Sequence, residues 1–415
     1  MGGGFVLQML VVRGGRPLAG TVEISGSKNA VLPMLAASIL FRRGCVIRKT
    51  PKLTDVEAAV EILRSLGAEV RETGDALEID PGRVRNLPIP AALMNRMRGS
   101  VFFAGAMMAR FGSCRLGRPG GCPLGERPVD FHGAGLRAFG AAEPEPGVFA
   151  GLPGGTAHLP YPSVGATENL LMAALGAETP CRIENAAREP EIVCLCDFLR
   201  AGGCRISGDG TETIDILPGL PDRAEQAPIP DRMEAATFLC AAASAGGAVR
   251  LTNVIPGHLT AVLEALNASG CRIEPGNREL AISAGALHAP GDLTTGPYPE
   301  FPTDAQAPML AAMLRAEGHF TMKETVFSDR MKHISGLCAL GGQIECRGNT
   351  ARVTGVPKLR GTAVRAEDLR GAAALAVAAL AAEGETRIDG LRHLLRGYER
   401  FDEKLRALGA AADLA

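Results

Sequence analysis

The sequence predicts an α/β protein made of six copies of one β-α-β-α-β-β unit. This prediction rests on the chain length, on a pattern that recurs about every 67 residues, and on six apolar helices. The chain has 415 residues, which is more than one hydrophobic core usually supports. We therefore expect at least two domains. Six similar units divide most simply into two domains of three, each with central helices walled by sheets.

Each copy of the repeat begins with a short strand after a glycine. A loop, a helix and a Leu-Gly or Gly-Gly turn into another strand follow. Apolar strand residues at equivalent positions recur at intervals of 66 to 71 residues. They are Ile47, Leu116, Ile183, Leu251, Met322 and Ile388. This spacing is too long for the common solenoid repeats.

A second helix, rich in Ala, precedes each copy. Its apolar residues cover nearly the whole circumference, so it should be buried. The helix predicted at 56–68 has one charged face instead and should lie outside. The six buried helices are expected at 25–40, 92–110, 163–177, 231–247, 303–318 and 367–384.

The composition excludes several classes of protein. Hydrophobic residues make up 46%, charged residues 21%, and the formal net charge is −1, which argues against a nucleic-acid scaffold. The apolar run at 5–12 is too short and lacks the flanks of a signal peptide, and no later run is long enough for a membrane span. Eleven cysteines without a secretory signal favour reduced thiols. We expect a soluble, cytoplasmic protein with no metal site.

One unit departs from the others in the loop between its first strand and its outer helix. This loop, residues 116–130, is rich in Gly and Pro and should be mobile. Cys122 lies at its centre between Arg118 and Arg127. A thiol beside cations on an exposed loop should have a lowered pKa. On these residues alone, a functional thiol and an incidental surface cysteine are both possible.

The segment Ser-Gly-Ser-Lys-Asn-Ala at 25–30 opens the first buried helix. Lys28 and Asn29 would lie near a helix N-terminus, where free amide groups attract anions. A simple capping turn with a solvated lysine is the alternative interpretation.

Charged residues also stand at the starts of other apolar helices, namely Arg98, Asp304, Asp368 and Arg370. An Asp in this position is usually a helix cap. Arg330 and Arg396 occupy the loop positions that correspond to the Cys122 loop in their own units. If these positions converge, the cations describe a site for a small, highly anionic ligand.

Several blocks, in order and over nearly the whole chain, resemble the UDP-N-acetylglucosamine 1-carboxyvinyltransferase (enolpyruvyl transferase) family. The resemblance implies an inside-out α/β barrel, or prism, with a substrate cleft between two domains. One domain would span 28–230 and the other 1–27 plus 231–415. The matching blocks are 25–40, 119–132, 162–170, 184–193, 230–238, 301–308, 324–333, 367–375 and 396–410.

The implied reaction moves the enolpyruvyl group of phosphoenolpyruvate to the 3′-hydroxyl of UDP-N-acetylglucosamine. It proceeds by addition and elimination of phosphate, without cofactor or metal, and is the first committed step of peptidoglycan precursor synthesis. The resemblance implies Cys122 as the proton donor to C3 and Asp304 as the base. Lys28, Arg127 and Arg396 would hold the phosphate, and Arg330 and Arg370 the carboxylate.

The other substrate contacts also follow from the resemblance. Asn29 would contact substrate and intermediate, and Asp368 belongs to the implied substrate-binding set. Tyr161 stands where some members carry a lysine that touches the uracil side. Because some members replace the loop cysteine by Asp and escape fosfomycin, Cys122 predicts sensitivity. The implied nucleotide-sugar contacts are Arg98, Arg127, Pro128, Val129, Asp130, Phe131, Ser163, Val164, Gly165 and Val326.

Two other functions are compatible with this fold. One is the sister reaction, which transfers enolpyruvyl to shikimate 3-phosphate and does not depend on a loop cysteine. The other is a non-catalytic protein that binds a nucleotide sugar. Such a protein should have lost Cys122, Asp304 or Lys28, and all three are present.

Overall fold

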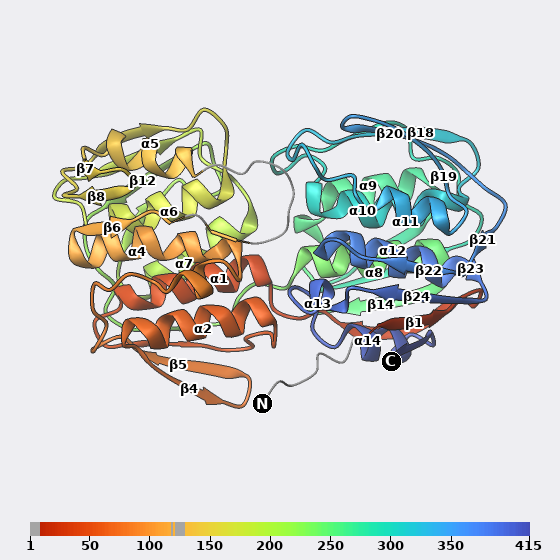
Figure 1. The fold of residues 1–415 in the computed structure, drawn as a ribbon, viewed down its shortest axis with the longest axis horizontal. Coiled ribbons are helices and arrows are strands. Elements are labelled where there is room, and N and C mark those ends of the chain that lie inside the picture. Colours follow the sequence, from red (N-terminus) through yellow and green to blue (C-terminus); the bar gives the residue numbers. More distant parts are fainter. Residues whose placement is uncertain (1–8, 118, 121–128) are drawn as a thin grey trace. The chain divides into compact units, whose positions relative to one another are not determined.

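The computed structural model describes residues 9–117, 119–120 and 129–415. They form two compact units. One comprises the chain up to Ser25 and from Pro230 to Ala415, and the other runs from Gly26 to Ile229. The sequence-based division places these boundaries one or two residues further along the chain. Figure 1 labels many of the elements of both units.

In the unit from Gly26 to Ile229, the described strands form sheets of order β13-β3-β5-β4, β11-β12-β10-β9 and β6-β8-β7. The helices are α1 (Lys28–Ala37), α2 (Thr54–Leu66), α3 (Ala91–Met94), α4 (Phe102–Phe111), α5 (Asp130–Ala138), α6 (Val164–Ala174) and α7 (Pro190–Ala201), with the 3₁₀ turns η1 (Ser38–Leu40) and η2 (Arg98–Val101). The strands are β3 (Cys45–Ile47), β4 (Glu69–Thr73), β5 (Ala76–Asp80), β6 (Ser113–Arg115), β7 (Ala142–Glu145), β8 (Val148–Ala150), β9 (Gly155–His158), β10 (Cys181–Glu184), β11 (Arg205–Ser207), β12 (Thr213–Leu217) and β13 (Ala224–Gln226).

In the other unit, the sheets have the order β22-β24-β1-β25, β15-β16-β14-β2 and β17-β18-β20-β19, with a short pair β21-β23. The helices are α8 (Arg232–Ala245), α9 (Thr260–Ala268), α10 (Thr303–Ala312), α11 (Ile334–Ala339), α12 (Leu369–Ala381), α13 (Leu391–Leu394) and α14 (Phe401–Ala407), with the 3₁₀ turns η3 (Pro256–His258) and η4 (Met313–Arg315). The strands are β1 (Leu10–Arg13), β2 (Leu18–Glu23), β14 (Gly247–Thr252), β15 (Arg272–Pro275), β16 (Glu279–Ala284), β17 (Leu293–Thr294), β18 (His319–Lys323), β19 (Gln343–Arg347), β20 (Thr350–Thr354), β21 (Leu359–Arg360), β22 (Ala363–Arg365), β23 (Ala382–Glu383), β24 (Glu385–Asp389) and β25 (Ala411–Leu414).

The four-stranded sheets share one pairing scheme, as the predicted repeat requires, whereas the repeat that contains the Cys122 loop has a sheet of only three described strands, β6-β8-β7. In one of them β17 is parallel to β18, β18 is antiparallel to β20, and β20 is antiparallel to β19. The last repeat ends with β25, and its missing strand is supplied by β1 from the start of the chain, which pairs with β24 and β25. The two chain ends are thus joined in one sheet.

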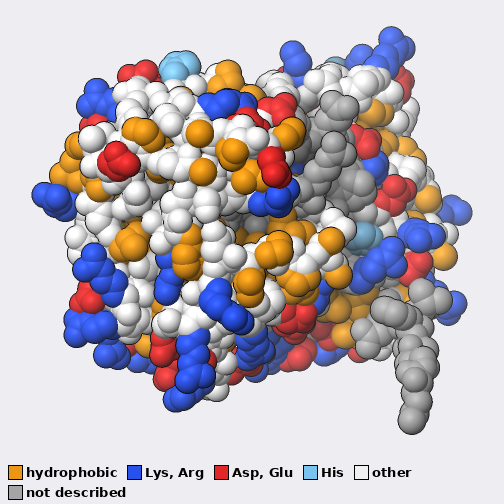
Figure 2. Space-filling view, turned by 60° about the vertical axis from the view of Figure 1, so that its left-hand side comes forward, with side chains coloured by type: hydrophobic (Ala, Val, Ile, Leu, Met, Phe, Trp, Pro, Cys, Tyr) orange, Lys and Arg blue, Asp and Glu red, His pale blue; other side chains and the backbone are white. Residues whose placement is uncertain are grey.

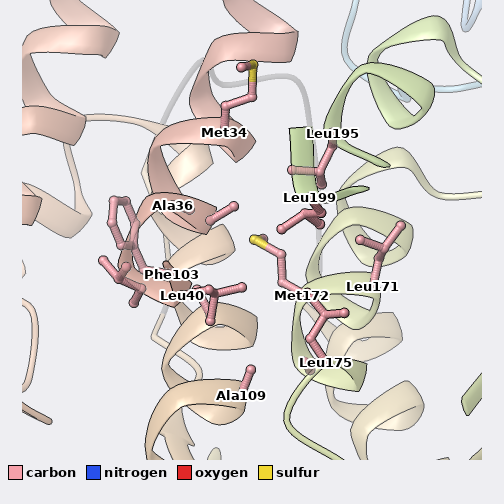
Figure 3. Close-up of a cluster of buried hydrophobic side chains, with 14 of the residues drawn as sticks. Met34, Ala36, Leu40, Phe103, Ala109, Leu171, Met172, Leu175, Leu195 and Leu199 are labelled. Atoms are coloured by element: carbon pink, nitrogen blue, oxygen red, sulfur yellow. The ribbon is translucent and has the colours of Figure 1, made fainter. Parts of the chain in front are cut away.

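The apolar helices lie inside their units, as their sequences predict. In one unit α8, α10 and α12 pack against one another, and in the other α4 packs against α6 and α1. Met34, Leu40, Phe103, Met172 and Leu199 belong to one buried cluster drawn from α1, η1, α4, α6 and α7 (Figure 3). The helices are therefore the core, and the sheets cover them.

Two details differ from the sequence-based expectation. The helix predicted at 92–110 is broken into α3, η2 and α4. The break lies at Met97, whose backbone is extended and which separates α3, with no buried residues, from the largely buried turn η2. Leu116 lies just beyond β6 and is only partly buried, whereas its equivalents such as Ile183 and Leu251 are fully buried in their strands.

The surface agrees with the balanced composition. On the face drawn in Figure 2, Lys and Arg side chains are interspersed with Asp and Glu side chains. No helix in the described ranges combines the length and apolar character that crossing a bilayer requires. Eight described cysteines are buried free thiols, whereas Cys338 and Cys346 are exposed.

Gly105→Ala should destabilise the protein, although Gly→Ala in a helix interior normally stabilises by about 1 kcal/mol. A Cβ at Gly105 in α4 would lie 2.1 Å from the backbone oxygen of Asn169 in α6. The two helices would have to separate, and overpacking of this kind costs about 1–3 kcal/mol. Gly165→Ala is the control for stability, because its Cβ would meet no atom closer than 3.7 Å. Urea unfolding of both variants tests this, and an unchanged or higher midpoint for Gly105→Ala would contradict it.

Candidate active site

Asp304 lies between two buried guanidinium groups. Its Oδ1 accepts a hydrogen bond from Nη2 of Arg330 and its Oδ2 accepts one from Nη2 of Arg370, each at 2.7 Å. The side chains of Arg330 and Arg370 are 2% and 4% exposed, whereas that of Asp304 is 25% exposed. The carboxylate therefore has an accessible side, while its two cations are shielded from water.

The starts of two central helices create this arrangement. Asp304 is in the first turn of α10, but it does not cap that helix. Asp368 is the N-cap of α12, and its Oδ1 accepts hydrogen bonds from the backbone N–H groups of Arg370 and Gly371, both at 2.9 Å. This cap fixes the position of Arg370 on the helix. Asp368 thus has a structural role in addition to the predicted substrate contact.

The charges in this cluster are strongly coupled. Burial by itself would lower the pKa of Arg370, but the Asp304 carboxylate raises that pKa well above its usual value. Burial lowers the pKa of the nearby His333 to about 4, and Arg330 acts in the same direction against the opposing effect of Asp368. His333 is therefore neutral near pH 7, and the two arginines supply the positive charge beside Asp304.

The loop after β18 holds Arg330 in place. The Glu324 carboxylate accepts hydrogen bonds from the backbone N–H groups of Val326 and Phe327 at 2.7 and 3.1 Å, and from the Thr303 hydroxyl at 2.9 Å. Thr303 directly precedes Asp304. Glu324 therefore ties the loop that carries Val326 and Arg330 to the start of α10.

Arg396 lies in the segment between α13 and α14 and is half-buried. Two residues later, the hydroxyl of Tyr398 accepts a hydrogen bond from Nη1 of Arg370 at 3.0 Å. The segment that bears Arg396 is thus joined to the Asp304 cluster.

In the other unit, Lys28 is the first residue of α1, and Ser27 caps that helix. The Lys28 ammonium lies 3.7 Å from a carboxylate oxygen of Asp55, and both side chains are largely buried. Lys28 is therefore not a solvated surface lysine, which was the alternative to a functional role. Asn29 follows it in the first turn and is half-buried.

Several predicted nucleotide-sugar contacts gather at the starts of η2, α5 and α6. The Ser163 hydroxyl caps α6 by accepting a hydrogen bond from the backbone N–H of Ala166 at 3.4 Å, and Val164 and Gly165 lie in the first turn of that helix. A Cβ at Gly165 would lie 3.7 Å from His132 of α5.

Other predicted nucleotide-sugar contacts lie around His132 of α5 or next to it in sequence. Burial, reinforced by the positive charge of Arg98, lowers the pKa of His132 to about 4. Arg98 is itself half-buried at the start of η2, and Phe131 packs on the core next to His132. Val129 immediately precedes α5, and Asp130 is its exposed first residue. The backbone carbonyl oxygen of Tyr161 accepts a hydrogen bond from the backbone N–H of Ser163 at 2.7 Å.

Cys122, Arg127 and Pro128 lie outside the described residues. Gly117 and Gly120 belong to the described part of their loop. A Cβ on Gly120 would lie 1.9 Å from the Asn95 carbonyl oxygen, and one on Gly117 would lie 2.6 Å from the Met94 side chain. These two glycines permit close packing of the loop on the end of α3.

The structure also shows residues that sequence reasoning missed, namely Glu324, Thr237 and Tyr398. Glu324 and Tyr398 fall in blocks that resemble the family, but the sequence suggests a role in ligand binding only for their basic neighbours, Arg330 and Arg396. Thr237 lies in an Ala-rich helix and resembles a small core residue. Within the described ranges, no group of three or more His, Cys, Asp or Glu side chains could hold a metal ion. The Asp304 cluster offers a carboxylate and two guanidinium groups, which suit proton transfer and the binding of an anionic ligand.

Comparison with curated proteins gives close relatives over the full length. A protein from Desulfosudis oleivorans named UDP-N-acetylglucosamine 1-carboxyvinyltransferase is 43% identical over 412 residues, which cover 98% of this chain and 99% of that protein. A protein of the same name from Gloeobacter violaceus is 44% identical over 410 residues, 97% of this chain and 89% of that protein.

Solved structures show the same fold. The enolpyruvyl transferase NikO from Streptomyces tendae has a TM-score of 0.87 and 26% identity, covering 98% of this chain and 99% of NikO. An EPSP synthase from Acinetobacter baumannii has a TM-score of 0.73 at 20% identity, covering 98% and 99% of the two chains. The family model described as EPSP synthase (3-phosphoshikimate 1-carboxyvinyltransferase) matches residues 12–405. The predicted two-domain α/β fold is confirmed, and the chain belongs to this family of carboxyvinyltransferases.

Proposed function

We propose that the protein transfers the enolpyruvyl group of phosphoenolpyruvate to the 3′-hydroxyl of UDP-N-acetylglucosamine and releases phosphate. Relatives named for this reaction match nearly the whole chain. The structural observation that carries the proposal is the accessible Asp304 carboxylate between Arg330 and Arg370. It combines an acceptor for a hydroxyl proton with cations for an anionic substrate.

The reaction needs one proton donor and one proton acceptor. The sugar hydroxyl attacks C2 of phosphoenolpyruvate, its proton passes to a base, and C3 gains a proton from an acid. In the resulting tetrahedral ketal, C3 loses a proton as the C2–O bond to phosphate breaks. The double bond is restored, and no net oxidation or reduction takes place.

We assign the base role to Asp304 and the acid role to Cys122. The two arginines favour the ionised form of Asp304, which is the form that can accept a proton. Arg330 and Arg370 would face the substrate carboxylate, and Lys28, Arg127 and Arg396 the phosphate.

The second substrate would be held by the other set of residues. Arg98, the stretch Arg127 to Phe131, and Ser163 to Gly165 are the proposed nucleotide-sugar contacts of one unit, and Val326 that of the other. The starts of η2, α5 and α6 supply a cation and helix N-termini, which suit a diphosphate.

The biological setting is also a proposal. A carboxyvinyl transfer to this nucleotide sugar would serve peptidoglycan precursor synthesis in the cytoplasm, where both substrates are made. It would then contribute to cell shape and division, and Cys122 would make the enzyme a fosfomycin target.

Phosphate release from phosphoenolpyruvate, measured with and without UDP-N-acetylglucosamine, tests the function. We expect release only with the nucleotide sugar, and a sugar product that is heavier by one enolpyruvyl group in mass spectrometry. Release with shikimate 3-phosphate instead would establish the sister reaction. Binding of the nucleotide sugar with no release from either acceptor would establish the non-catalytic alternative.

A further inference from the structure

Two hydroxyl groups lie behind Arg370, deep in the unit that contains Asp304. Tyr398 is 1% exposed and Thr237, in α8, is fully buried. The Tyr398 hydroxyl lies 2.8 Å from Oγ1 of Thr237 and 3.0 Å from Nη1 of Arg370. Oγ1 of Thr237 is in turn 2.9 Å from the backbone oxygen of Met233.

The chemistry of these groups fixes the direction of every hydrogen bond. A guanidinium group only donates, so the Tyr398 hydroxyl must accept from Arg370. A backbone carbonyl only accepts, so Thr237 must donate to Met233. The single proton of Tyr398 is then free to be donated to Thr237. The result is a chain of hydrogen bonds in which Arg370 donates to Tyr398, Tyr398 donates to Thr237, and Thr237 donates to the backbone of α8.

This chain holds one end of the Arg370 guanidinium while Asp304 occupies the other. Nη1 bonds to Tyr398 and Nη2 bonds to Asp304 at 2.7 Å. The guanidinium carbon also lies 5.4 Å from the centre of the Tyr398 ring, within the range of a cation–π contact. With both ends bonded, Arg370 cannot rotate away from Asp304 without leaving a buried donor unpaired.

Packing alone does not require these hydroxyls. The centroid of the Tyr398 ring lies 5.1 Å from that of Phe401, with the rings tilted, and the centroid of Phe238 of α8 lies 5.5 Å from that of Phe401. A phenylalanine would therefore fit this aromatic cluster. Burial raises the pKa of Tyr398 above its usual value, which keeps its hydroxyl neutral. A neutral acceptor can orient Arg370 without competing with Asp304 for its charge.

We propose that Tyr398 and Thr237 are positioning residues that orient Arg370, and through it Asp304, for the transfer reaction. This inference rests on the proposed function. Tyr398 also belongs to the short segment that carries Arg396, so the same anchor would fix the positions of a carboxylate-binding and a phosphate-binding cation together.

The test uses Tyr398→Phe, Thr237→Val and the double variant in the full-length enzyme. In Tyr398→Phe a buried guanidinium donor loses its acceptor, and kcat/KM for phosphoenolpyruvate should fall about tenfold or more. The Kd for UDP-N-acetylglucosamine should stay within about twofold, because no described residue among its proposed nucleotide-sugar contacts is hydrogen-bonded to Tyr398 or Thr237. Thr237→Val should act in the same direction but less strongly. The double variant should be no worse than Tyr398→Phe, since both changes interrupt one chain.

Thr386→Val is the matched control. Thr386 in β24 is also fully buried, and its Oγ1 has no hydrogen-bond partner in the part of the chain that the structure describes. Its kinetics should equal those of the unmodified enzyme. Wild-type kcat/KM in Tyr398→Phe, or additive losses in the double variant, would overturn the positioning role while leaving the proposed function intact.

The two ideas can fail separately. If the unmodified enzyme releases no phosphate with UDP-N-acetylglucosamine, the proposed function fails. The hydrogen-bond chain from Arg370 to Met233 is then tested by urea unfolding of four proteins. These are the unmodified enzyme, Tyr398→Phe, Thr237→Val and the double variant. Non-additive losses of stability for Tyr398→Phe and Thr237→Val support the coupled chain, and additive losses refute it.

Discussion

Asp304→Ala should bind UDP-N-acetylglucosamine with nearly unchanged affinity but turn over about a hundredfold more slowly or worse. The variant removes the proposed base, and it also removes the shared counterion of two guanidinium groups that are 2% and 4% exposed. Arg330 and Arg370 would then face each other as like charges. We expect the substrate carboxylate to be misplaced as well as the hydroxyl to lack its base. Steady-state kinetics and titration calorimetry with the nucleotide sugar measure the two effects separately.

The same variant should lose stability, because breaking a buried ion pair leaves uncompensated charge at a cost of about 3–5 kcal/mol. Asp304 is partly exposed, so the lower end of this range is expected. Asp215→Ala is the matched control. Asp215 also pairs with an arginine through two hydrogen bonds, from Arg182 at 2.7 and 3.1 Å, but both side chains are about half exposed. Its loss should cost no more than about 1 kcal/mol and leave kcat unchanged. Wild-type turnover in Asp304→Ala would remove this residue from the mechanism.

The fold could be predicted because its main signals are local and repeated. Apolar residues around a whole helix circumference can only be buried, and six such helices at regular spacing leave few other arrangements. The sequence does not predict which strand completes the sheet of the last repeat. The pairing of β1 with β24 and β25 joins the two ends of the chain, and nothing local at residues 10–13 indicates which repeat they complete.

For the candidate site too, local signals identify some residues, whereas their contacts depend on the fold. Asp304, Arg330 and Arg370 are conspicuous because charges at apolar helix starts need a reason. Their contact with one another, across 26 and 66 residues of sequence, is a result of the fold. Thr237 and Tyr398 are 161 residues apart, and each by itself looks like an ordinary core residue. Polar groups that serve another side chain carry no pattern of their own, so only the structure identifies them.

Cys122→Ser should lose activity by about a hundredfold or more, because a serine hydroxyl is a far weaker acid than a thiol near neutral pH. The prediction concerns chemistry rather than packing, since Cys122 lies outside the described residues. Cys122→Asp should retain substantial activity, because a carboxylic acid can also donate a proton to C3. Cys338→Ser is the control, since Cys338 is an exposed free thiol of α11 that has no place in the proposed mechanism.

Fosfomycin separates the role of this thiol from a general effect of mutation on the loop. Preincubation with the nucleotide sugar and millimolar fosfomycin should inactivate the unmodified enzyme and Cys338→Ser alike, and increase the mass of the peptide that contains Cys122. Cys122→Asp should stay active and unmodified, because a carboxylate is a much poorer nucleophile than a thiolate. Full activity in Cys122→Ser would show that the thiol is not the essential acid. An unchanged Cys122 peptide would show that it is not the reactive nucleophile either. The proton for C3 would then have to come from another group.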